Sequence, residues 1–455
     1  MKVLLIEPAK SPLSIGGEDL FIFESLALEY VAAGVAKDHD VRILDMRLDK
    51  DLPGTLEAFR PDVVGITSYT VHVNFVRKTC EQIKKWNPDI LMVVGGHHAT
   101  VMPEDFVSPY IDLIVMGEGV SVFRQIVRNF EKGTGYSDIP GVAYEKNGAF
   151  FRTAWSETVD LDEIPFPARQ LTQKYRKHFY SEWMKPIASL RTSRGCPHRC
   201  SFCALWKISK GRYLTRNPEK IVEELATIHE PNVFFADDES LLDVSRMTRL
   251  AQLIKDAGIR KRYFLYGRSD TVARNPELLE KWKEVGLARV FVGLEFFKSE
   301  DLDFIRKNST LENNRDAIRI LHDIGIDEYA SFIVRPEFGR DDFLALRQYC
   351  RDLKLRFASF AVLTPLPGTD LYDDVYRRML THDYDYFDFL HTLLPTKLPL
   401  KEFYREYYLL LRKAISADNQ LAFLRKYPRK EIVPTLLKGF RIFSQIKRAY
   451  LDYRE

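Results

Sequence analysis

The stretch Arg194–Cys203, with the sequence RGCPHRCSFC, decides how the rest of the chain is interpreted. It holds three of the five cysteines in the spacing C-x-x-x-C-x-x-C. Thiolates are soft ligands that bind zinc or iron–sulfur clusters. Three thiolates on one short loop can hold three irons of a four-iron cluster and leave the fourth iron open to a ligand that is not protein. The spacing therefore predicts a catalytic [4Fe–4S] cluster held by Cys196, Cys200 and Cys203.

A structural zinc ion with His198 as the fourth ligand is the alternative. His198 lies between the first two cysteines, from where it would reach a shared tetrahedral centre only awkwardly. No second C-x-x-C and no H-x-x-x-H pair follows along the chain. The other two cysteines, Cys80 and Cys350, are isolated, and we expect them to be small buried apolar side chains. The sequence favours the cluster.

The composition is that of a globular protein with two or three domains. The chain has 455 residues, 45% of them hydrophobic and 29% charged, with a formal net charge of +3. This balance argues against a nucleic-acid partner, and no apolar run reaches the ~18 residues that a membrane span needs. Clustered cysteines do not form a disulfide framework, and the first residues show a strand pattern instead of a signal peptide. We therefore expect a cytoplasmic protein.

In the first 150 residues, short apolar runs alternate with helical patterns. Such alternation, with buried strands, is typical of a doubly wound (Rossmann-like) parallel sheet. We expect strands at 3–6, 41–45, 63–67, 91–95 and 112–116, and helices at 20–35, 74–86 and 120–130.

Glycine and small polar residues follow the third, fourth and fifth of these strands. The carboxyl ends of parallel strands meet at one edge of a sheet, where ligands bind. Glycine there lets backbone N–H groups approach a ligand closely. Any one of these segments alone is equally typical of a tight turn and of a binding loop, but three in register predict a binding site. Its residues are Thr67, Ser68, Tyr69, Gly95, Gly96, His97, Gly117 and Glu118.

The centre of the chain repeats strand–helix units after the cysteine loop. Six units predict a partial (β/α)6 barrel of the TIM type, with its site at the carboxyl ends of the strands. We expect four parts: a sheet domain at 1–135, a connector with an Asn147-Gly148 hairpin at 136–184, the barrel at 185–375, and a helical region at 376–455. Expected barrel strands are 187–191, 233–236, 263–267, 290–295, 329–334 and 360–364, with helices at 218–227, 244–257, 277–285, 311–324 and 342–353.

The cysteine loop resembles the signature of the radical SAM superfamily. There the same spacing follows the first barrel strand, and an aromatic residue, here Phe202, precedes the last cysteine. The resemblance implies that the open iron binds S-adenosylmethionine (SAM) and that polar groups at the strand ends contact it. A run of acidic residues can equally cap a helix. The resemblance assigns to SAM the residues Phe202, Asp238, Glu239, Arg268, Ser269, Glu295, Ser331 and Arg335.

Residues 1–130 resemble the cobalamin-binding domain that precedes many radical SAM enzymes. The G-G-x-H-x-T and G-E-G segments of that domain recur here at 95–100 and 117–119. The D-x-H-x-x-G loop, which supplies an axial histidine in methionine-synthase-like domains, is missing after the first strand. The resemblance therefore implies cobalamin without that histidine on cobalt and with residues 69–72 near its lower face. His97 and His98 are expected to contact the corrin or nucleotide tail, or to cap a helix.

Within this family, the segments at 175–180, 203–213 and 396–404 look most like the hopanoid C-3 methylase group. The resemblance implies methyl transfer to an unactivated carbon of a hydrophobic polycyclic lipid, through a 5′-deoxyadenosyl radical and methylcobalamin. An electron donor such as flavodoxin or ferredoxin would supply the cluster. Two alternatives stay open: a ring-forming enzyme resembling the anaerobic magnesium-protoporphyrin ester cyclase, and a non-enzymatic cobalamin or metal sensor.

The carboxyl-terminal residues are basic, with 13 Lys and Arg against 6 Asp and Glu from position 401 onward. Within 433–451, apolar and basic residues alternate at helical spacing. A basic amphipathic helix can lie on an anionic membrane surface. The alternative is a helix packed on its own domain with a solvated basic face. Peripheral contact with the inner face of a membrane is thus one expectation for this region.

Overall fold

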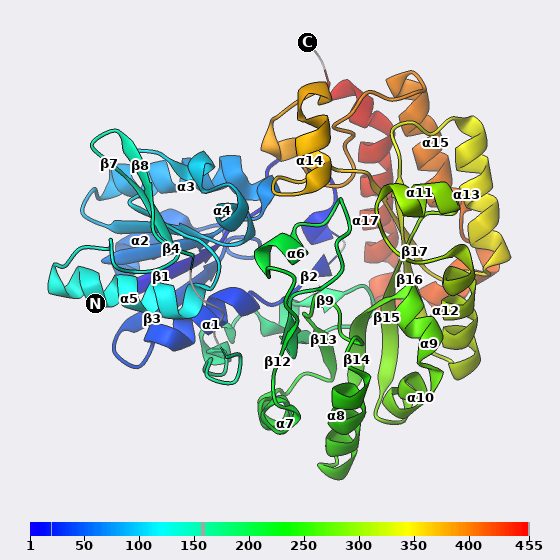
Figure 1. Ribbon diagram of the computed structural model, residues 1–455, viewed down its shortest axis with the longest axis horizontal. Helices are drawn as coiled ribbons and strands as arrows, with labels where there is room; N and C mark the ends of the chain where they lie inside the picture. The colour runs from blue at the N-terminus through cyan, green and yellow to red at the C-terminus, as the bar shows by residue number, and fades with distance from the viewer. Residues whose placement is uncertain (20, 156–159, 454–455) are drawn as a thin grey trace. The chain divides into compact units, whose positions relative to one another are not determined.

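The computed structural model describes residues 1–19, 21–155 and 160–453 and divides into two compact units (Figure 1). The first unit comprises Met1–Ser14, Glu24–Phe179 and Asp383–Asp385. The second, called the barrel unit below, comprises Ile15–Phe23, Tyr180–His382 and Tyr386–Glu455. Short pieces of chain are thus exchanged between the units, because 15–23 and 383–385 each belong to the unit that is remote in sequence.

The first unit contains a seven-stranded sheet in the order β3-β1-β4-β5-β6-β7-β8, whose first five strands are parallel. This confirms the predicted doubly wound sheet. The Asn147-Gly148 turn, with φ of 53° and 76°, closes the hairpin β7–β8, which extends the sheet by antiparallel pairing with β6. The strands are β1 (Lys2–Glu7), β3 (Asp40–Asp45), β4 (Val63–Thr67), β5 (Leu91–Gly95), β6 (Leu113–Val115), β7 (Val142–Lys146) and β8 (Ala149–Arg152).

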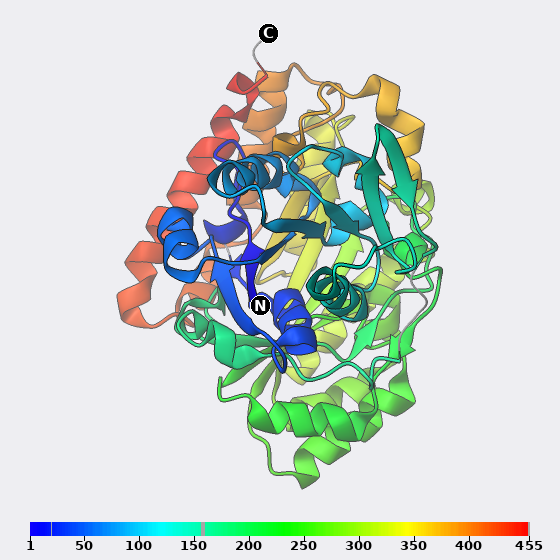
Figure 2. The same ribbon diagram turned by 90° about the vertical axis from the view of Figure 1, so that its left-hand side faces the viewer.

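Helices cover both faces of this sheet, and each face has its own apolar core (Figure 2). Leu28 of α1 and Phe123 of α5 lie in one core, while Leu56 of α2, Val76 of α3 and Ala99 of α4 lie in the other. The helices are α1 (Leu26–Val35), α2 (Leu52–Phe59), α3 (Val73–Trp86), α4 (His97–Val101) and α5 (Gly119–Lys132).

The prediction for this region needs two corrections. The helix expected at 20–35 begins at Leu26 (Leu20 itself is outside the described residues), because Phe21–Ile22 form strand β2 and pair with β9 (Tyr180–Ser181) in the barrel unit. Helix α2 was not expected, since its eight residues are too few to show a periodic pattern. Asp51 caps it by accepting a hydrogen bond from Gly54 N at 2.9 Å.

The barrel unit contains a six-stranded parallel sheet in the order β10-β13-β14-β15-β16-β17, which confirms the predicted partial barrel. Helices pack on its outer face around a large apolar core, as Figure 1 shows for α8, α10, α12 and α13. The strands are β10 (Ile187–Leu190), β13 (Asn232–Phe235), β14 (Arg262–Arg268), β15 (Leu287–Glu295), β16 (Asp327–Val334) and β17 (Ala358–Val362). A small ribbon pairs β11 (Ser193–Arg194) with β12 (Leu214–Thr215).

The helices between the strands fall where the sequence placed them, within two residues at each end. They are α7 (Pro218–Thr227), α8 (Val244–Asp256), α10 (Pro276–Glu284), α12 (Leu311–Ile324) and α13 (Arg340–Asp352). Shorter helices at the strand ends are α6 (Leu205–Ile208), α9 (Ser269–Arg274), α11 (Ser299–Phe304) and α14 (Asp370–Val375).

The last part of the chain is helical, as expected, with α15 (Leu400–Lys413), α16 (Ala417–Leu424) and α17 (Arg429–Arg448). Ile442 and Ile446 of α17 are buried in the same core as Phe403 and Tyr407 of α15. In the part of the chain that the structure describes, no helix combines the length and apolarity required to cross a membrane.

Candidate cofactor sites

The cysteine loop is fixed at its start by the two aspartates that follow β13. Asp237 is buried and accepts hydrogen bonds from Thr192 N at 2.7 Å and Ser193 N at 2.9 Å. Asp238 accepts one from Gly195 N at 2.6 Å. Gly195 has φ +91°, and a Cβ atom there would lie 2.2 Å from the carbonyl oxygen of Arg212. Only glycine satisfies both constraints, so Gly195 and the two aspartates fix the position of Cys196.

The end of the loop is held by backbone contacts to more distant elements. Ser201 N donates to Ile305 O at 3.0 Å, and Ser201 O accepts from Leu371 N at 3.0 Å. The indole of Trp206 donates to Cys200 O at 3.2 Å. Phe202 packs against an apolar cluster that includes Phe296 and Leu363. The loop is therefore preorganised by the barrel without any contribution from the thiols.

The three thiols suit a cluster better than a single ion. Burial raises the pKa of Cys196, and burial together with its cysteine neighbours raises that of Cys203 to about 12. Such thiols become thiolates only when a cation compensates the buried charge, which cluster irons do. Among residues 1–19, 21–155 and 160–453, no three His, Cys, Asp or Glu side chains converge as one metal ion requires. A cluster, in which each of the three thiolates binds a different iron, does not need that convergence.

Buried polar atoms around the loop also fit a group with acceptor sulfurs. His198 Nε2, Ser201 Oγ and Ser209 Oγ are buried and have no hydrogen-bond partner among the described residues. Burial and the charge of Arg268 lower the pKa of His198, so its ring is neutral and can donate from one nitrogen. Leaving donors unmatched is costly, and the sulfides of a cluster accept hydrogen bonds. The residues present therefore fit a [4Fe–4S] cluster.

Arg268 links the cysteine loop to the strand ends. Its guanidinium donates to Asp270 Oδ1 at 2.9 Å and to Lys307 O at 2.6 Å, and Nη1 lies 3.9 Å from Cys200 Sγ. Its backbone N–H donates to Glu239 Oε2 at 2.9 Å. A buried, fully engaged arginine beside a thiolate supplies fixed positive charge next to a cluster.

The two predicted carboxylates after β13 differ in environment. Glu239 is buried, and that burial raises its pKa to about 7 even though Arg268 opposes the rise. Its oxygens accept from the backbone of Arg268 and, more weakly, of Leu241 at 3.4 Å. Asp238 is only partly buried, and one of its carboxylate oxygens accepts a hydrogen bond from Gly195 N. Asp238 is therefore better placed than Glu239 to meet an ammonium group.

The remaining predicted SAM residues lie at the carboxyl ends of the strands, and most already have partners. Glu295, with φ +63°, accepts from Lys307 Nζ at 2.7 Å in a buried pair. Ser269 Oγ lies 3.0 Å from Ser309 Oγ. Arg335 pairs with Asp301 at 2.5 Å and Glu337 at 3.3 Å. Ser331 is half-buried on β16.

Lys307 contacts two of the predicted site residues, although the sequence did not indicate it. It is 5% exposed, neutralises Glu295, and accepts from Arg268 through its carbonyl oxygen. It follows α11 in a loop without motif or periodicity, so no local pattern could have pointed to it. Through its side chain and backbone, Lys307 connects the ends of β14 and β15.

In the first unit, the predicted segments meet at the carboxyl edge of the sheet. Ser68 N donates to Gly95 O at 2.9 Å, and His98 N donates to Ser68 O at 3.0 Å. Gly96 has φ +103°, and a Cβ atom there would lie 2.6 Å from Thr67 Oγ1 and 2.7 Å from Ser68 N. The loops after β4 and β5 are thus in direct contact, and glycine at 96 is what allows it.

Aromatic rings gather at this edge. Tyr69 is 57% exposed, and its ring centroid lies 6.1 Å from that of His97 and 6.0 Å from that of His72. Burial lowers the pKa of His72 to about 4, so its ring is neutral at physiological pH. An exposed aromatic beside a neutral imidazole suits a large flat ligand such as a corrin.

Two other predicted residues have structural roles. His98 is fully buried, with Nδ1 3.1 Å from Thr70 Oγ1 and Nε2 2.8 Å from Asp105 Oδ2. Both nitrogens are engaged by side chains, so His98 positions its loop, and it does not provide the helix cap that was one of the roles expected for it. Glu118 caps α5, accepting from Val120 N at 2.6 Å and Ser121 N at 2.9 Å. Beside it, Gly117 N donates to Thr100 Oγ1 at 3.0 Å.

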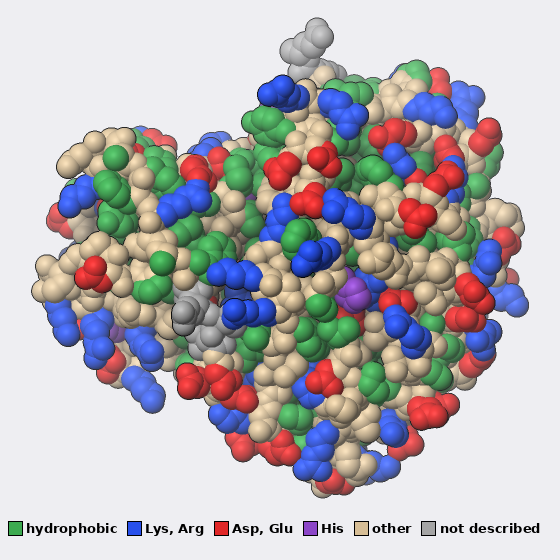
Figure 3. Space-filling model, viewed as in Figure 1, with side chains coloured by type: hydrophobic (Ala, Val, Ile, Leu, Met, Phe, Trp, Pro, Cys, Tyr) green, Lys and Arg blue, Asp and Glu red, His purple; other side chains and the backbone are tan. Residues whose placement is uncertain are grey.

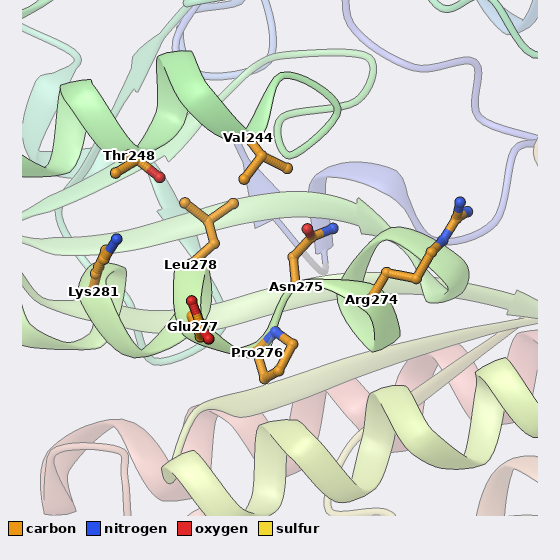
Figure 4. Close-up of a pocket in the computed structure, with 8 residues that line it drawn as sticks. All are labelled: Val244, Thr248, Arg274, Asn275, Pro276, Glu277, Leu278 and Lys281. Carbon is orange, nitrogen blue, oxygen red and sulfur yellow. The ribbon is translucent and has the colours of Figure 1, made fainter.

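A pocket of about 350 Å³ lies among the outer helices, between α8 and the α9–α10 turn (Figure 4). None of the predicted site residues lines it. Its lining residues are Val244, Thr248, Arg274, Asn275, Pro276, Glu277, Leu278 and Lys281. It is therefore separate from the strand ends that carry the thiols and carboxylates.

Comparison with known proteins gives the same two parts. Residues 14–127 match the family model of the B12 binding domain, and residues 190–350 match that of the radical SAM superfamily. The chain is 33% identical to hopanoid C-3 methylase of Methylococcus capsulatus, over 89% of this chain and 78% of that protein. It is 30% identical to anaerobic magnesium-protoporphyrin IX monomethyl ester cyclase of Rubrivivax gelatinosus, over 87% of this chain and 74% of that protein.

Two solved structures share the fold. OxsB, a cobalamin-dependent SAM radical enzyme with aqua-cobalamin and SAM bound, gives a TM-score of 0.74 at 16% identity, over 99% of this chain and 72% of that chain. TsrM of Kitasatospora setae, a radical SAM methyltransferase, gives a TM-score of 0.65 at 20% identity, over 83% of this chain and 76% of that chain.

The chain belongs to the cobalamin-dependent radical SAM enzymes. It is a radical SAM methyltransferase by type, and its cofactors are a [4Fe–4S] cluster, SAM and cobalamin.

Proposed function

We propose that this enzyme methylates an unactivated carbon of a hydrophobic, polycyclic lipid of the hopanoid kind. Hopanoid C-3 methylase is 33% identical over most of both chains, which supports a substrate of this class. The chemistry of the barrel interior supports it independently, and that interior carries the proposal.

Aromatic side chains line the concave face of the barrel sheet, opposite the helix layer. Tyr266 of β14, Phe291 of β15 and Tyr329 of β16 follow one another across three strands, with ring centroids 4.9 Å and 5.1 Å apart. All three are only partly buried, whereas their neighbours on the helix-facing side are fully buried. An accessible aromatic wall suits a flat apolar ligand better than a polar one.

Arg289, near the start of β15, packs against the same aromatic rings. The residue is 1% exposed, and its guanidinium lies over Tyr329 at 4.5 Å and over Phe357 at 4.7 Å. Glu182 accepts a hydrogen bond from it at 2.5 Å. Above the aromatic wall, Ser331 and Ser359 are half-buried on β16 and β17. This face of the sheet thus combines accessible aromatic rings with a few hydroxyls, as a sterol-like molecule with one polar end requires.

The cofactors supply the hydrogen abstraction and the methyl group that no side chain can supply. Cys196, Cys200 and Cys203 would hold the cluster, and Arg268 would fix positive charge beside it. Asp238 would orient the ammonium group of SAM, with Glu295 and Lys307 as a rigid neutral pair at the next strand end. Tyr69, Gly96 and His97 would contact cobalamin at the sheet edge. An electron donor of the flavodoxin or ferredoxin kind would reduce the cluster.

The methyl label of SAM tests the reaction. The reconstituted enzyme, reduced under anaerobic conditions, is incubated with methyl-labelled SAM and a pentacyclic hopanoid, and the product is weighed by mass spectrometry. A product heavier by one labelled methyl group is expected. SAM cleavage without label in any product would overturn the methyltransferase assignment and favour the ring-forming alternative, to which the cyclase relative points.

The aromatic wall tests the substrate class separately. Phe291→Ser should raise the KM for the lipid about tenfold or more, because burying the ligand against a ring contributes roughly 1.5–3 kcal/mol. SAM cleavage without lipid should stay at the parental rate. Phe151→Ser is the matched control, since that ring is 44% exposed and lies on β8 of the first unit. An unchanged KM for Phe291→Ser would exclude the barrel interior as the lipid site.

A further inference from the structure

Helix α17 carries a stripe of apolar side chains that face solvent. Val433, Leu436, Leu437 and Phe440 are 63%, 48%, 66% and 79% exposed. Their spacing of three, one and three residues places all four on one face of the helix. Single exposed apolar residues are ordinary, but four in one stripe mark an interaction surface. The four residues are called the α17 stripe below.

The opposite face of the same helix is what attaches it to the barrel unit. Ile442 and Ile446 are buried, and Phe443 contacts Tyr408 of α15 with ring centroids 6.5 Å apart. In the first half of the helix, Lys438 Nζ lies 3.1 Å from Tyr180 Oη. The helix therefore has a fixed orientation in its own unit, and the stripe is presented outward. Figure 2 shows α17, coloured orange-red to red, along the margin of that unit.

Basic side chains surround the stripe. All six lysines and arginines of the helix are exposed, while its one acidic residue, Glu431, lies 3.8 Å from Lys185. The face in Figure 3 instead shows acidic and basic side chains interspersed. The six basic residues are Arg429, Lys430, Lys438, Arg441, Lys447 and Arg448.

We propose that the α17 stripe docks this enzyme on an anionic lipid surface, with its apolar side chains between the acyl chains and its basic residues on the headgroups. Apolar side chains flanked by lysine and arginine are the composition of helices that lie in the plane of a membrane interface. Charge complementarity selects anionic lipid over a second protein copy, because two such faces would repel each other. No helix of the described residues spans a membrane, so this contact is peripheral.

The inference does not depend on the identity of the reaction. It would, however, bring the enzyme to the phase in which a polycyclic lipid is dissolved. An enzyme of the proposed specificity would then meet its substrate at a high local concentration. Docking and the reaction can fail independently, so vesicle flotation and SAM cleavage are measured separately.

Vesicle flotation of the full-length holoenzyme tests the proposal. The wild type should float with vesicles of phosphatidylcholine and phosphatidylglycerol, float less with phosphatidylcholine alone, and be released by salt. The double variant Leu437→Glu with Phe440→Glu should bind at least about tenfold more weakly. Lys430→Gln with Arg441→Gln should lose about tenfold, and only on anionic vesicles. SAM cleavage in solution should be unchanged in both variants.

The matched control is Leu344→Glu with Leu380→Glu, two leucines that are 54% and 47% exposed outside α17. Its flotation should equal that of the wild type, and thermal unfolding should confirm that every variant is folded. Wild-type protein that stays out of anionic vesicles would overturn the proposal. So would a stripe variant that floats normally, or one that converts a dimer into monomers without altering flotation, since a second copy would then cover the stripe.

Discussion

The mouth of the barrel and the carboxyl edge of the first sheet differ in the groups that they offer to a ligand. At the mouth, charged side chains are buried and paired: Arg268 with Asp270, and Lys307 with Glu295. At the sheet edge, contacts run through backbone groups and close-packed glycines, and the ring of Tyr69 is 57% exposed. A small zwitterion beside a cluster needs charges held at fixed points. A large macrocycle needs an open surface that the backbone can approach.

The difference also shows in which groups are kept neutral. Burial raises the pKa of Glu239 at the mouth to about 7 and lowers that of His72 at the edge to about 4. In both places desolvation is the main cause, but its effects on stability run in opposite directions with pH. The predictions below perturb one region while leaving the other intact.

The largest effect is expected from the cysteine loop. Cys200→Ala should reduce SAM cleavage to background, because two thiolates cannot hold a cluster with an open iron. Cobalamin binding, measured by its visible absorption after gel filtration, should persist. Cys350→Ala is the control: that thiol is buried in the apolar core of the barrel, and its loss should cost only about 1 kcal/mol of stability. Cleavage by a reconstituted Cys200→Ala protein would exclude the proposed ligand set.

The converse perturbation is Gly96→Ala at the sheet edge. A Cβ atom 2.6 Å from Thr67 Oγ1, on a residue with φ +103°, must displace the loops after β4 and β5. Cobalamin affinity should fall at least tenfold, and stability by about 1–3 kcal/mol. SAM cleavage should remain.

Gly133→Ala separates close approach from backbone strain. Gly133 also has positive φ, at +65°, but a Cβ atom there would meet no other atom within 4 Å. Substitution there should cost about 1 kcal/mol and leave cobalamin affinity unchanged. Equal cobalamin affinities in the two glycine variants would show that the edge is not the binding surface.

A smaller effect is expected from Asp238→Asn at the mouth. The amide can still accept from Gly195 N, so the loop should keep its shape while the negative charge is lost. A charged hydrogen bond contributes about 1.5–3 kcal/mol, so the Kd for SAM should rise roughly ten- to a hundredfold, measured by equilibrium dialysis. The visible spectrum of the cluster should not change. A Kd equal to that of the wild type would assign the ammonium group to another residue.

The elements of both regions could be predicted because their evidence is local. Strand–helix alternation located the parallel strands, and the spacing of three cysteines located the cluster loop. The pairing of residues could not be predicted in the same way. Lys307 meets Glu295 only because α11 returns the chain to the strand end, and Phe23 stacks on Phe234 with centroids 4.4 Å apart from a segment 211 positions earlier. Such contacts depend on tertiary structure, and periodicity carries no information about them.

The same limit applies to the roles of individual polar residues. Asp238, Glu239 and Glu118 all follow strands, and the sequence predicts the same role for each, a carboxylate that faces a ligand. In the structure, Glu118 caps α5 and Glu239 is buried against the backbone, while Asp238 is partly exposed. Which role each takes depends on the direction of the following turn. Sequence spacing places a residue at the edge of a sheet but does not determine that direction.

The pH dependence of stability should also separate the two regions. The His72 pKa falls from an ordinary value of 6.5 to about 4 in the folded chain, because burial opposes the charged ring. Between these values the unfolded chain binds a proton that the folded chain does not, so stability should decline as the pH falls from 6.5 to 4. The loss is at most about 3 kcal/mol. His72→Gln should remove most of this loss of stability at low pH. The measurement is the Tm of the cobalamin-free protein across that pH range.

Glu239→Gln provides the opposite case. Its folded pKa of about 7 lies above the ordinary 4.5, so the buried carboxyl favours folding at low pH, and that contribution disappears as the pH rises from 4.5 through 7. The glutamine variant should therefore gain stability relative to the wild type above pH 7. The loss of stability between pH 6.5 and 4, which His72 causes, should be unchanged. If both substitutions altered stability in the same pH range, the two regions would share one electrostatic environment, and the contrast between a charged mouth and a neutral edge would not hold.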